Sequence, residues 1–338
     1  MPGKEDILVP YADMKKIFSE ILLKQGFTED KAGQCAEIFT ASSADGVYTH
    51  GVNRFPTFVS YIKKGYVKPA AEPSLKNSSG SMEQWDGNLG PGPLNAIAAT
   101  DRAMQLADQS GIGCVALSNT NHWMRGGTYG WYAAKKGYAF IGFTNTIANM
   151  PVWGGKDKKL GNNPLIIAIP YKKEAIVLDM AMSQYSIGSL QQAKMKGERL
   201  AVNGGFDADG NLTNDPAAII GSKRPLPVGY WKGAGMALLL DMLAVLLSGG
   251  LATHEISSKQ AEYGLSQVFI AIDLSKLHPA SSMNNILEAI ILDYHSAEKA
   301  DADGRILYPG ERILATRKRN LEKGIPVLRA VWEEIGAL

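Results

Sequence analysis

The chain has 338 residues, of which 45% are hydrophobic and 20% charged, as in an ordinary globular protein with room for two or three lobes. Its 35 basic and 33 acidic residues give a net charge of +2, without the basic excess of nucleic-acid-binding proteins. The longest apolar run, residues 236–247, is interrupted by Asp241 and is shorter than the roughly 20 residues of a membrane-spanning helix. We therefore expect no nucleic-acid or membrane partner and predict that this run is a buried helix.

The chain has two cysteines, Cys35 and Cys114, and neither has a second Cys or His at metal-ligand spacing. Cys35 falls in a helical pattern and Cys114 in an apolar strand pattern, so we predict two buried thiols and no metal site. Free thiols fit a reducing compartment, and no apolar leader precedes the first helical pattern. We therefore expect a cytoplasmic protein.

The first seventy residues show helical periodicity. Apolar side chains recur every three to four positions in residues 10–26. Thr28 is a capping residue that predicts a second helix through Ala44, and residues 55–64 form a third helical pattern. We predict an N-terminal helical lobe over residues 1–70.

The loop between the second and third predicted helices carries the first candidate site. His50 lies four residues ahead of Arg54, and Gly51 follows His50 directly. Imidazole delivers a proton near neutral pH, and guanidinium binds a carboxylate with two parallel hydrogen bonds; reduction of a keto acid needs both. The alternative is a surface loop before a helix. A helix start disfavours an imidazolium, whereas Asp45 favours one if it folds back onto His50, and the residues leave this choice open.

Strand and helix patterns alternate in residues 71–155, as is typical of an α/β fold. These patterns cover residues 74–86, 93–110, 114–118, 129–136 and 140–145. The motif Asn121-His122-Trp123-Met124-Arg125-Gly126-Gly127 follows the second strand pattern. Because ligands of α/β proteins bind at the carboxyl ends of strands, His122 is the second candidate catalytic residue. A buried structural histidine is the open alternative, and Arg125 is either a surface residue or a second anion contact.

The second half of the chain continues the alternation but lacks a G-x-G-x-x-G fingerprint after a strand, so its motifs do not indicate a Rossmann fold. Strand patterns occur at residues 165–169, 175–179 and 267–273, and a helical pattern covers 281–296. The polar run 207–211 lacks the glycine and glutamate of a calcium loop and predicts a turn with Asx-type hydrogen bonds. The basic groups at 223–224 and 317–319 are interpreted as solvated surface.

Two positions in this half remain ambiguous. Asp179 ends an apolar strand pattern and is either a loop cap or a group facing a ligand. Lys232 precedes the long apolar helix, whose first backbone N–H groups would suit a phosphate, although an exposed lysine is the simpler interpretation.

Four separate motifs together resemble the type-2 malate/L-lactate dehydrogenase family. They are Asp45-Gly46-Val47-Tyr48-Thr49-His50-Gly51-Val52-Asn53-Arg54-Phe55-Pro56, Asn121-His122-Trp123-Met124-Arg125-Gly126-Gly127, Gly161-Asn162-Asn163-Pro164 and Gly229-Tyr230-Trp231-Lys232-Gly233. The resemblance extends from the first helix to the last forty residues. Two segments are similar to members of the family that reduce a keto sugar acid: Trp123-Met124-Arg125 and Met150-Pro151-Val152-Trp153-Gly154.

The resemblance implies an α/β fold with a non-Rossmann mixed-sheet NAD(P)-binding domain and an N-terminal helical lobe. It divides the chain into the helical lobe (1–70), an α/β catalytic and substrate part (71–155), the nicotinamide-binding mixed-sheet domain (156–290) and a C-terminal helical segment packed on the N-terminal lobe (291–338). It also implies a cytoplasmic homodimer whose sites lie between lobes and near the subunit boundary.

The resemblance also assigns roles to residues. His50 would be the proton donor and His122 a second catalytic histidine, while Arg54, Asn121 and Arg125 would bind the substrate. NADH or NADPH would contact Ala175, Ile176, Val177, Leu178, Asp179, Met180, Ala181, Trp231, Lys232, Gly310, Glu311 and Arg312. The expected reaction is hydride transfer to the C2 ketone of a small keto sugar acid. A malate- or L-lactate-type enzyme and a non-catalytic sugar-acid-binding protein are the alternatives.

Overall fold

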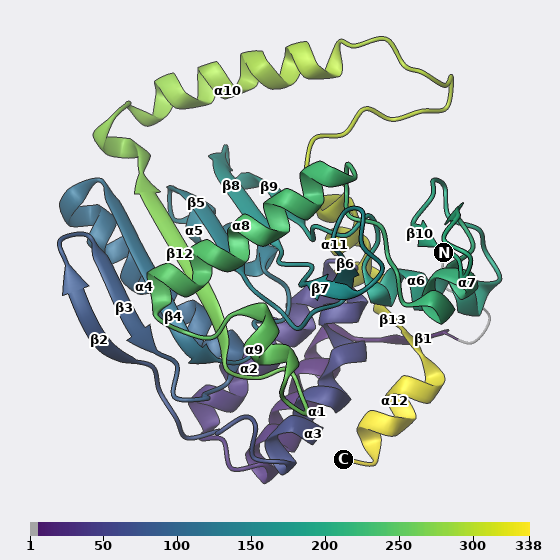
Figure 1. The fold of residues 1–338 in the computed structure, drawn as a ribbon. Coiled ribbons are helices and arrows are strands. Elements are labelled where there is room, and N and C mark those ends of the chain that lie inside the picture. Colours follow the sequence, from purple (N-terminus) through teal and green to yellow (C-terminus); the bar gives the residue numbers. More distant parts are fainter. Residues whose placement is uncertain (1–5) are drawn as a thin grey trace.

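A computed structural model describes residues 6–338 of the protein, and its centre is one seven-stranded sheet (Figure 1). The strand order is β2 (Ser74–Ser79), β3 (Met82–Asp86), β4 (Ile112–Thr120), β12 (Leu265–Asp273), β5 (Tyr138–Thr144), β8 (Leu165–Tyr171) and β9 (Glu174–Met180). β3 and β4 are parallel, and all other neighbours in this sheet are antiparallel. A Rossmann sheet is mostly parallel, so the predicted non-Rossmann mixed sheet is confirmed.

Helices cover both faces of the sheet (Figure 1). α4 (Gly92–Ser110) and α5 (Gly127–Lys135) pack on one face, and α8 (Trp231–Ser248) packs on the other. Because side chains alternate along a strand, β4 contributes Val115 and Leu117 to the α4 side and Cys114 and Ala116 to the α8 side. Cys114 is therefore a core thiol, as predicted, and burial raises its pKa to about 11.

The helical lobe consists of α1 (Tyr11–Lys24), α2 (Glu29–Ala44) and α3 (Phe55–Lys63), close to the predicted bounds. Three fully buried aromatic rings hold these helices together: Phe18 stacks on Phe55 at 4.0 Å between ring centroids, and Phe39 meets Phe55 edge-on at 5.2 Å. Such pairs contribute roughly 0.5–1.5 kcal/mol each beyond their buried area. The loop that carries His50 connects α2 to α3 and is therefore anchored at both ends.

The two ends of the described chain meet on this lobe. β1 (Asp6–Val9) pairs with β13 (Ile325–Leu328). α12 (Arg329–Gly336) follows β13, and the centroid of its Trp332 ring lies 6.5 Å from that of Phe18. α11 (Glu311–Lys323) contacts α2, where the Asn320 amide donates to the carbonyl of Ala44 at 2.9 Å. The four-part division of the chain remains a prediction, since the central sheet takes strands from both the second and the third part.

Helix α8 corrects one prediction. Residues 236–247 are helical, but the helix is not buried: Ala237 and Leu240 face the sheet, whereas Leu239 and Leu246 are 57% and 75% exposed. A helix in the outer layer buries only one stripe, so an all-round apolar helix leaves an uncovered face. Among the described residues, α8 is the one helix whose length and composition suit a membrane crossing, and 33% of it is buried.

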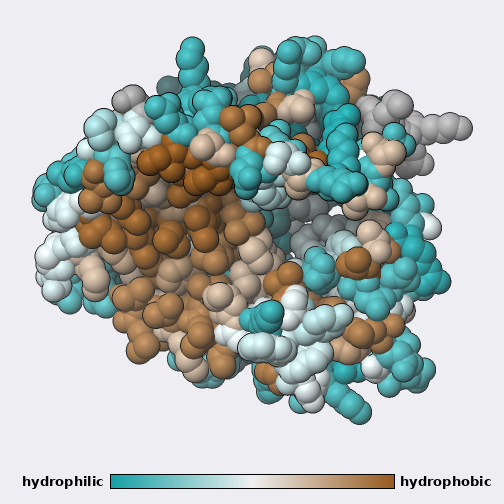
Figure 2. Space-filling view, turned by 90° about the horizontal axis from the view of Figure 1, so that it is seen from above, coloured by the Kyte–Doolittle hydropathy of each residue, from teal (hydrophilic) through white to brown (hydrophobic). Residues whose placement is uncertain are grey.

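A second helix adds to this uncovered surface. α10 (Ala280–His295) lies away from the body on the same side as α8 (Figure 1). Viewed from that side, the molecule shows a broad apolar area (Figure 2). We call it the α8–α10 face, and its exposed apolar residues are Met236, Leu238, Leu239, Met242, Leu243, Leu246, Ile286, Ile290 and Leu292.

Shorter elements complete the fold. They are the hairpins β6 (Met150–Pro151) with β7 (Lys158–Leu160) and β10 (Gly205–Phe206) with β11 (Leu212–Thr213), the helices α6 (Ile187–Lys196), α7 (Pro216–Ser222) and α9 (Thr253–Ser257), and the 3-10 turns η1 (Tyr48–His50), η2 (Val52–Arg54) and η3 (Leu274–Lys276). The Asp207 carboxylate accepts hydrogen bonds from the backbone N–H groups of Gly210 and Asn211, both at 2.8 Å. The predicted Asx-type turn is thus confirmed.

Candidate active site

The two candidate histidines lie side by side. His50 ends η1, and His122 follows β4, yet their rings are 5.7 Å apart between centroids and within 19° of parallel. Antiparallel and parallel pairing within the sheet fixes where β4 ends, and the aromatic contacts of the helical lobe fix the loop before α3. The fold thus brings together two imidazoles that are 72 residues apart in the sequence.

His122 is held as one neutral tautomer. The backbone N–H of Met124 donates to Nδ1 of His122 at 2.9 Å, which places the ring proton on Nε2. Met124 adopts a left-handed backbone conformation (φ 65°) that turns its N–H back toward the ring. Burial lowers the pKa of His122 well below its ordinary value, and the positive charges of Arg54 and His50 lower it further. His122 is therefore a neutral hydrogen-bond donor through Nε2.

His50 lies in a more balanced electrostatic environment. Burial lowers its pKa, the Asp179 carboxylate raises it, and the guanidinium groups of Arg54 and Arg125 lower it. Nδ1 of His50 lies 3.2 Å from the Thr49 hydroxyl. The carboxylate that favours an imidazolium is thus Asp179, whereas Asp45 does not fold back onto His50 and binds Arg125 and Arg317.

Gly51 lets the His50 loop pack closely on α2. A Cβ at this position would lie 2.2 Å from Oγ of Ser43 and 3.0 Å from the carbonyl oxygen of Phe39. The same Ser43 hydroxyl donates to Phe39 and accepts from the N–H of Val52, both at 2.8 Å. The glycine after His50 is therefore required by packing, and a side chain there would displace the imidazole.

Arg54 lies beside the histidine pair. Arg54 and His122 line one pocket, whose other walls come from α3 and from Val67, Asn121 and Met124. Nη2 of Arg54 is 3.5 Å from Oε2 of Glu262, and the other carboxylate oxygen of Glu262, Oε1, accepts the N–H of Ile147 at 3.1 Å. The Arg54 side chain remains 31% exposed, so its guanidinium can meet a bound anion.

Asn121 and Arg125 have internal partners in this structure. The Asn121 amide donates to the carbonyl oxygens of Tyr66, Leu89 and Gly90 at 2.9–3.1 Å and so holds three loop segments together. The Arg125 side chain is 2% exposed and forms an ion pair with Asp45. Both residues support the His122 loop, and their direct contact with a substrate remains a prediction.

The predicted cofactor segments on β9 and α11 are neighbours. Residues 174–180 form the edge strand β9, with Ala181 directly after it. The N–H of Val177 donates away from the sheet to the carbonyl of Pro309 at 3.1 Å, and by the two-residue alternation the N–H groups of Ala175 and Asp179 face the same way. Gly310 has a left-handed conformation (φ 93°), and a Cβ there would lie 3.2 Å from the nitrogen of Val177.

The other predicted cofactor segment starts α8. The N–H of Val228 donates to the carbonyl of Met182 at 2.8 Å. This hydrogen bond holds the segment before Trp231 and Lys232 beside the residues that directly follow β9. The Trp231 side chain is exposed, and Nζ of Lys232 lies 6.0 Å from the centre of its ring. Glu311, a predicted cofactor contact, has an internal partner: its carboxylate accepts the N–H of Tyr308 at 3.0 Å.

These segments fit a nicotinamide dinucleotide. The outward-facing backbone of the edge strand offers donors and acceptors on either side of Val177, where Gly310 lets its own segment pack closely against the strand. The first turn of α8 and Lys232 together provide positive charge for phosphate groups. Among the described residues, no group of three potential ligands suits a metal ion.

Sequence reasoning missed several residues around the site. Arg317 is not solvated surface: its side chain is 23% exposed, binds Asp45 and lies over the Trp131 ring at 5.0 Å. Asp45 offered a signal, because an acidic residue at a helix C-terminus is unfavourable unless a cation binds it. Glu262 offered none, since it lies in a loop 208 residues beyond Arg54.

A family model described as malate/L-lactate dehydrogenase matches residues 9–336. The chain belongs to this family. It is accordingly an oxidoreductase that acts on CH–OH groups with a nicotinamide cofactor and a small-molecule acid as substrate. The resemblance seen in the sequence is confirmed.

Curated relatives and solved structures of this dehydrogenase family match nearly the whole length of the chain. Proteins named 2,3-diketo-L-gulonate reductase from Pasteurella multocida and Klebsiella pneumoniae are 47% and 45% identical over 331 residues, covering 98% of this chain and 99% of each relative. The malate dehydrogenase structure from Pyrococcus horikoshii is 27% identical with a TM-score of 0.90, covering 100% of this chain and 96% of that one. The sulfolactate dehydrogenase from Methanocaldococcus jannaschii is 27% identical with a TM-score of 0.88, covering 97% and 95%.

Proposed function

We propose that this protein reduces the C2 ketone of 2,3-diketo-L-gulonate to 3-dehydro-L-gulonate with NADH or NADPH. The observation that carries the proposal is the convergence of His50, His122 and Arg54 at one site. The names of the 45–47% identical relatives support the substrate. A reduced nicotinamide, when bound, supplies the hydride to the ketone carbon.

The two histidines take different roles in this proposal. Neutral His122 cannot release its Nε2 proton near neutral pH, because that would leave an imidazolate, so it donates a hydrogen bond to the ketone oxygen. His50, with the Asp179 carboxylate nearby, is the residue that can carry an additional proton and pass it to the same oxygen. Donors preplaced at the oxygen where negative charge develops lower the barrier most.

Arg54 both binds the substrate and adjusts His50. Its guanidinium would hold the substrate carboxylate and orient the ketone, a positioning effect. The same positive charge lowers the pKa values of both histidines in the free protein. A bound carboxylate would offset it, so substrate binding would favour protonation of His50 when the acid is needed.

The dinucleotide would lie along β9 and reach the start of α8. Ala175, Asp179 and the neighbouring residues of β9 would present backbone groups on either side of Val177, against which Pro309 and Gly310 pack. Trp231 offers an exposed ring and Lys232 a positive charge for the phosphates. We infer that the protein works in the cytoplasm, where both reduced nicotinamides are present.

A panel of 2-keto acids tests the proposed reaction through the loss of nicotinamide absorbance. We expect the highest kcat/KM for 2,3-diketo-L-gulonate and low values for oxaloacetate and pyruvate. Preference for the three- or four-carbon acids would replace the proposal with the malate- or L-lactate-type reaction.

A fluorescence titration with NADH separates a reductase from a non-catalytic sugar-acid-binding protein. The reductase binds the cofactor without a sugar acid present, and the indole of Trp231 provides an internal probe of this binding. A protein that binds the sugar acid but gives no fluorescence change at millimolar NADH would support the non-catalytic alternative.

We also propose that the protein is a homodimer that covers the α8–α10 face. Large exposed apolar patches mark interaction sites, and this protein has one on the α8–α10 face. In a two-fold dimer the same patch of each subunit contacts that of the other, so a single patch is sufficient. We expect twice the chain mass in sedimentation, and Leu239→Glu together with Leu246→Glu should give a monomer. Leu75→Glu is the control, because this leucine on β2 is 53% exposed, close to the 57% of Leu239. A monomeric wild-type protein would contradict the proposal.

A further inference from the structure

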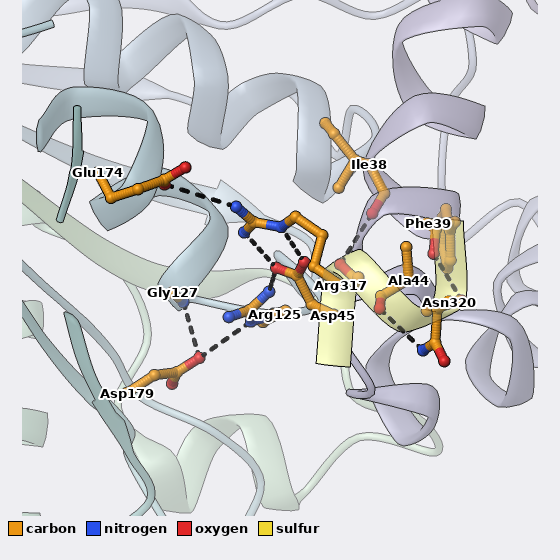
Figure 3. Close-up of polar contacts among 12 residues, drawn as sticks. Ile38, Phe39, Ala44, Asp45, Arg125, Gly127, Glu174, Asp179, Arg317 and Asn320 are labelled. Atoms are coloured by element: carbon orange, nitrogen blue, oxygen red, sulfur yellow. Dashed lines mark hydrogen bonds and ion pairs between the residues drawn. The ribbon is translucent and has the colours of Figure 1, made fainter. Parts of the chain in front are cut away.

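A buried ion pair joins the loops that carry the two histidines. Asp45 lies five residues before His50, and Arg125 lies three residues after His122. Nη1 of Arg125 donates to a carboxylate oxygen of Asp45, and both side chains are at most 6% exposed (Figure 3). Breaking a buried pair of this kind leaves a charge without its partner, and that charge then turns to the nearest opposite one.

The nearest other carboxylate to Arg125 is Asp179. Nε of Arg125 lies 3.8 Å from Oδ2 of Asp179, beyond hydrogen-bond distance, while the N–H of Gly127 donates to the same oxygen at 2.8 Å (Figure 3). Among the described residues, Nε and Nη2 of Arg125 are buried and make no hydrogen bond. Arg125 therefore has unused donors directed at the carboxylate that also faces His50.

The charges that face His50 come from every element around it. β9 contributes Asp179, η2 contributes Arg54, and the loop after β4 contributes Arg125 and the neutral His122. Asp179 is the single negative charge in this group, and Arg125 and His50 compete for it. Asp45 does not contact the imidazole; it contacts Arg125 and Arg317, so it can act on His50 only through Arg125.

We propose that Asp45 is a positioning residue that acts on His50 through Arg125: by binding the guanidinium, it leaves the Asp179 carboxylate available to the imidazolium. The inference rests on the proposed reductase function, in which His50 carries the proton. Without the Asp45 charge, Arg125 would move from 3.8 Å into hydrogen-bond contact with Asp179. His50 would then lose its counter-charge and would bind its proton more weakly.

The test is the titration of His50 followed by NMR, with the His50 resonance assigned by its absence from the spectrum of His50→Asn. For Asp45→Asn we expect the titration midpoint to fall by about one pH unit, since an opposite charge close to a titrating group is worth one unit or more. The reduction kcat/KM at neutral pH should fall by up to about tenfold, and the NADH affinity should stay the same. Asp45→Glu should restore both.

Arg125→Met separates this action from a merely structural one. Removing the guanidinium should raise the His50 midpoint, opposite to Asp45→Asn. In the Arg125→Met background, Asp45→Asn should no longer move the midpoint, because the two residues act in series. Glu174→Gln is the matched control, since Glu174 pairs with Arg317 at 3.7 Å and lies outside the group facing His50.

Several outcomes would overturn the proposal. They are an unchanged His50 midpoint in Asp45→Asn, a midpoint in Arg125→Met that does not rise, and an equal shift from Asp45→Asn with and without Arg125. If Asp45→Asn does not fold, the midpoint in Arg125→Met still decides. The titration needs no substrate, so failure of every keto acid to react would reject the reductase function and leave this measurement valid.

Discussion

The histidine site and the proposed cofactor edge, formed by β9 and the start of α8, are built in different ways. Around the histidines, internal contacts fix the loops: the Asn121 amide donates to three carbonyl groups, and the space beside Gly51 admits no side chain. Along the start of α8 and the α8–α10 face, large side chains such as Trp231 and Leu246 remain 63% and 75% exposed. We infer from this difference that the reacting groups are positioned before any ligand binds, whereas the proposed cofactor side would be completed by the dinucleotide and, in the proposed dimer, by a second subunit.

The largest expected effect comes from the preorganised side. His50→Asn should lower kcat by roughly 10²–10⁴-fold, the usual contribution of a general acid, because no other group there can release a proton at neutral pH. NADH affinity, measured by fluorescence, should remain the same, since His50 is not among the proposed cofactor contacts on β9 and α8. Steady-state kinetics and thermal unfolding of the variant test this.

His122→Asn is the matched control for the assignment of the acid. It removes the hydrogen bond from Nε2 but not the proton source, so its loss in kcat should be smaller than that of His50→Asn. Near-normal turnover in His50→Asn combined with a large loss in His122→Asn would reverse the two roles. His122 would then be the acid, and its description as a fixed neutral tautomer would be wrong.

Arg54→Ala should have the next largest effect. Hydrogen bonds to charged groups contribute about 1.5–3 kcal/mol, so we expect KM for the keto acid to rise roughly 10–100-fold, with a smaller change in kcat. Glu262→Gln is the control, because it removes the internal partner at 3.5 Å and leaves the guanidinium free for the substrate. A KM that stays constant in Arg54→Ala would show that another cation holds the carboxylate.

The same difference between local and long-range contacts explains what the sequence could predict. The three helices of the helical lobe and most strands followed from periodicity, and His50 and His122 followed from residue type and their place after a helix and a strand. The position of β12 between β4 and β5 was not predictable, because it depends on pairing across more than 120 residues. Glu262 beside Arg54 is hidden for the same reason.

Periodicity also failed where the answer depends on what lies outside the chain. An apolar pattern all round a helix predicts burial, but it does not distinguish packing inside the fold from packing against another surface. In α8, Ala237 and Leu240 pack inside, while Leu239 and Leu246 do not. Arg317 was misjudged in the opposite direction, since its buried partner Asp45 lies 272 residues away.

The pH dependence sharpens the assignment of His50. Its pKa is lowered from the ordinary value of 6.5, first by burial, so the protonated acid is lost as pH rises through a value below 6.5. Reduction kcat/KM should therefore be level at lower pH and fall tenfold per unit above that value, while oxidation of the product should show the reverse trend. His50→Asn should abolish this limb, and its persistence in the variant would assign it to another group.

The smallest expected effect tests the cofactor side. Lys232 is exposed at the start of α8, where a phosphate would meet its charge in contact with solvent, so Lys232→Ala should weaken NADH binding by no more than about fivefold (roughly 0.2–1 kcal/mol). The effect should fade at high salt, whereas Lys232→Arg should bind normally and Lys24→Ala on the helical lobe should change nothing. A loss as large as that of Arg54→Ala would mean that the start of α8 is as preorganised as the histidine site, and the contrast between the two regions would no longer hold.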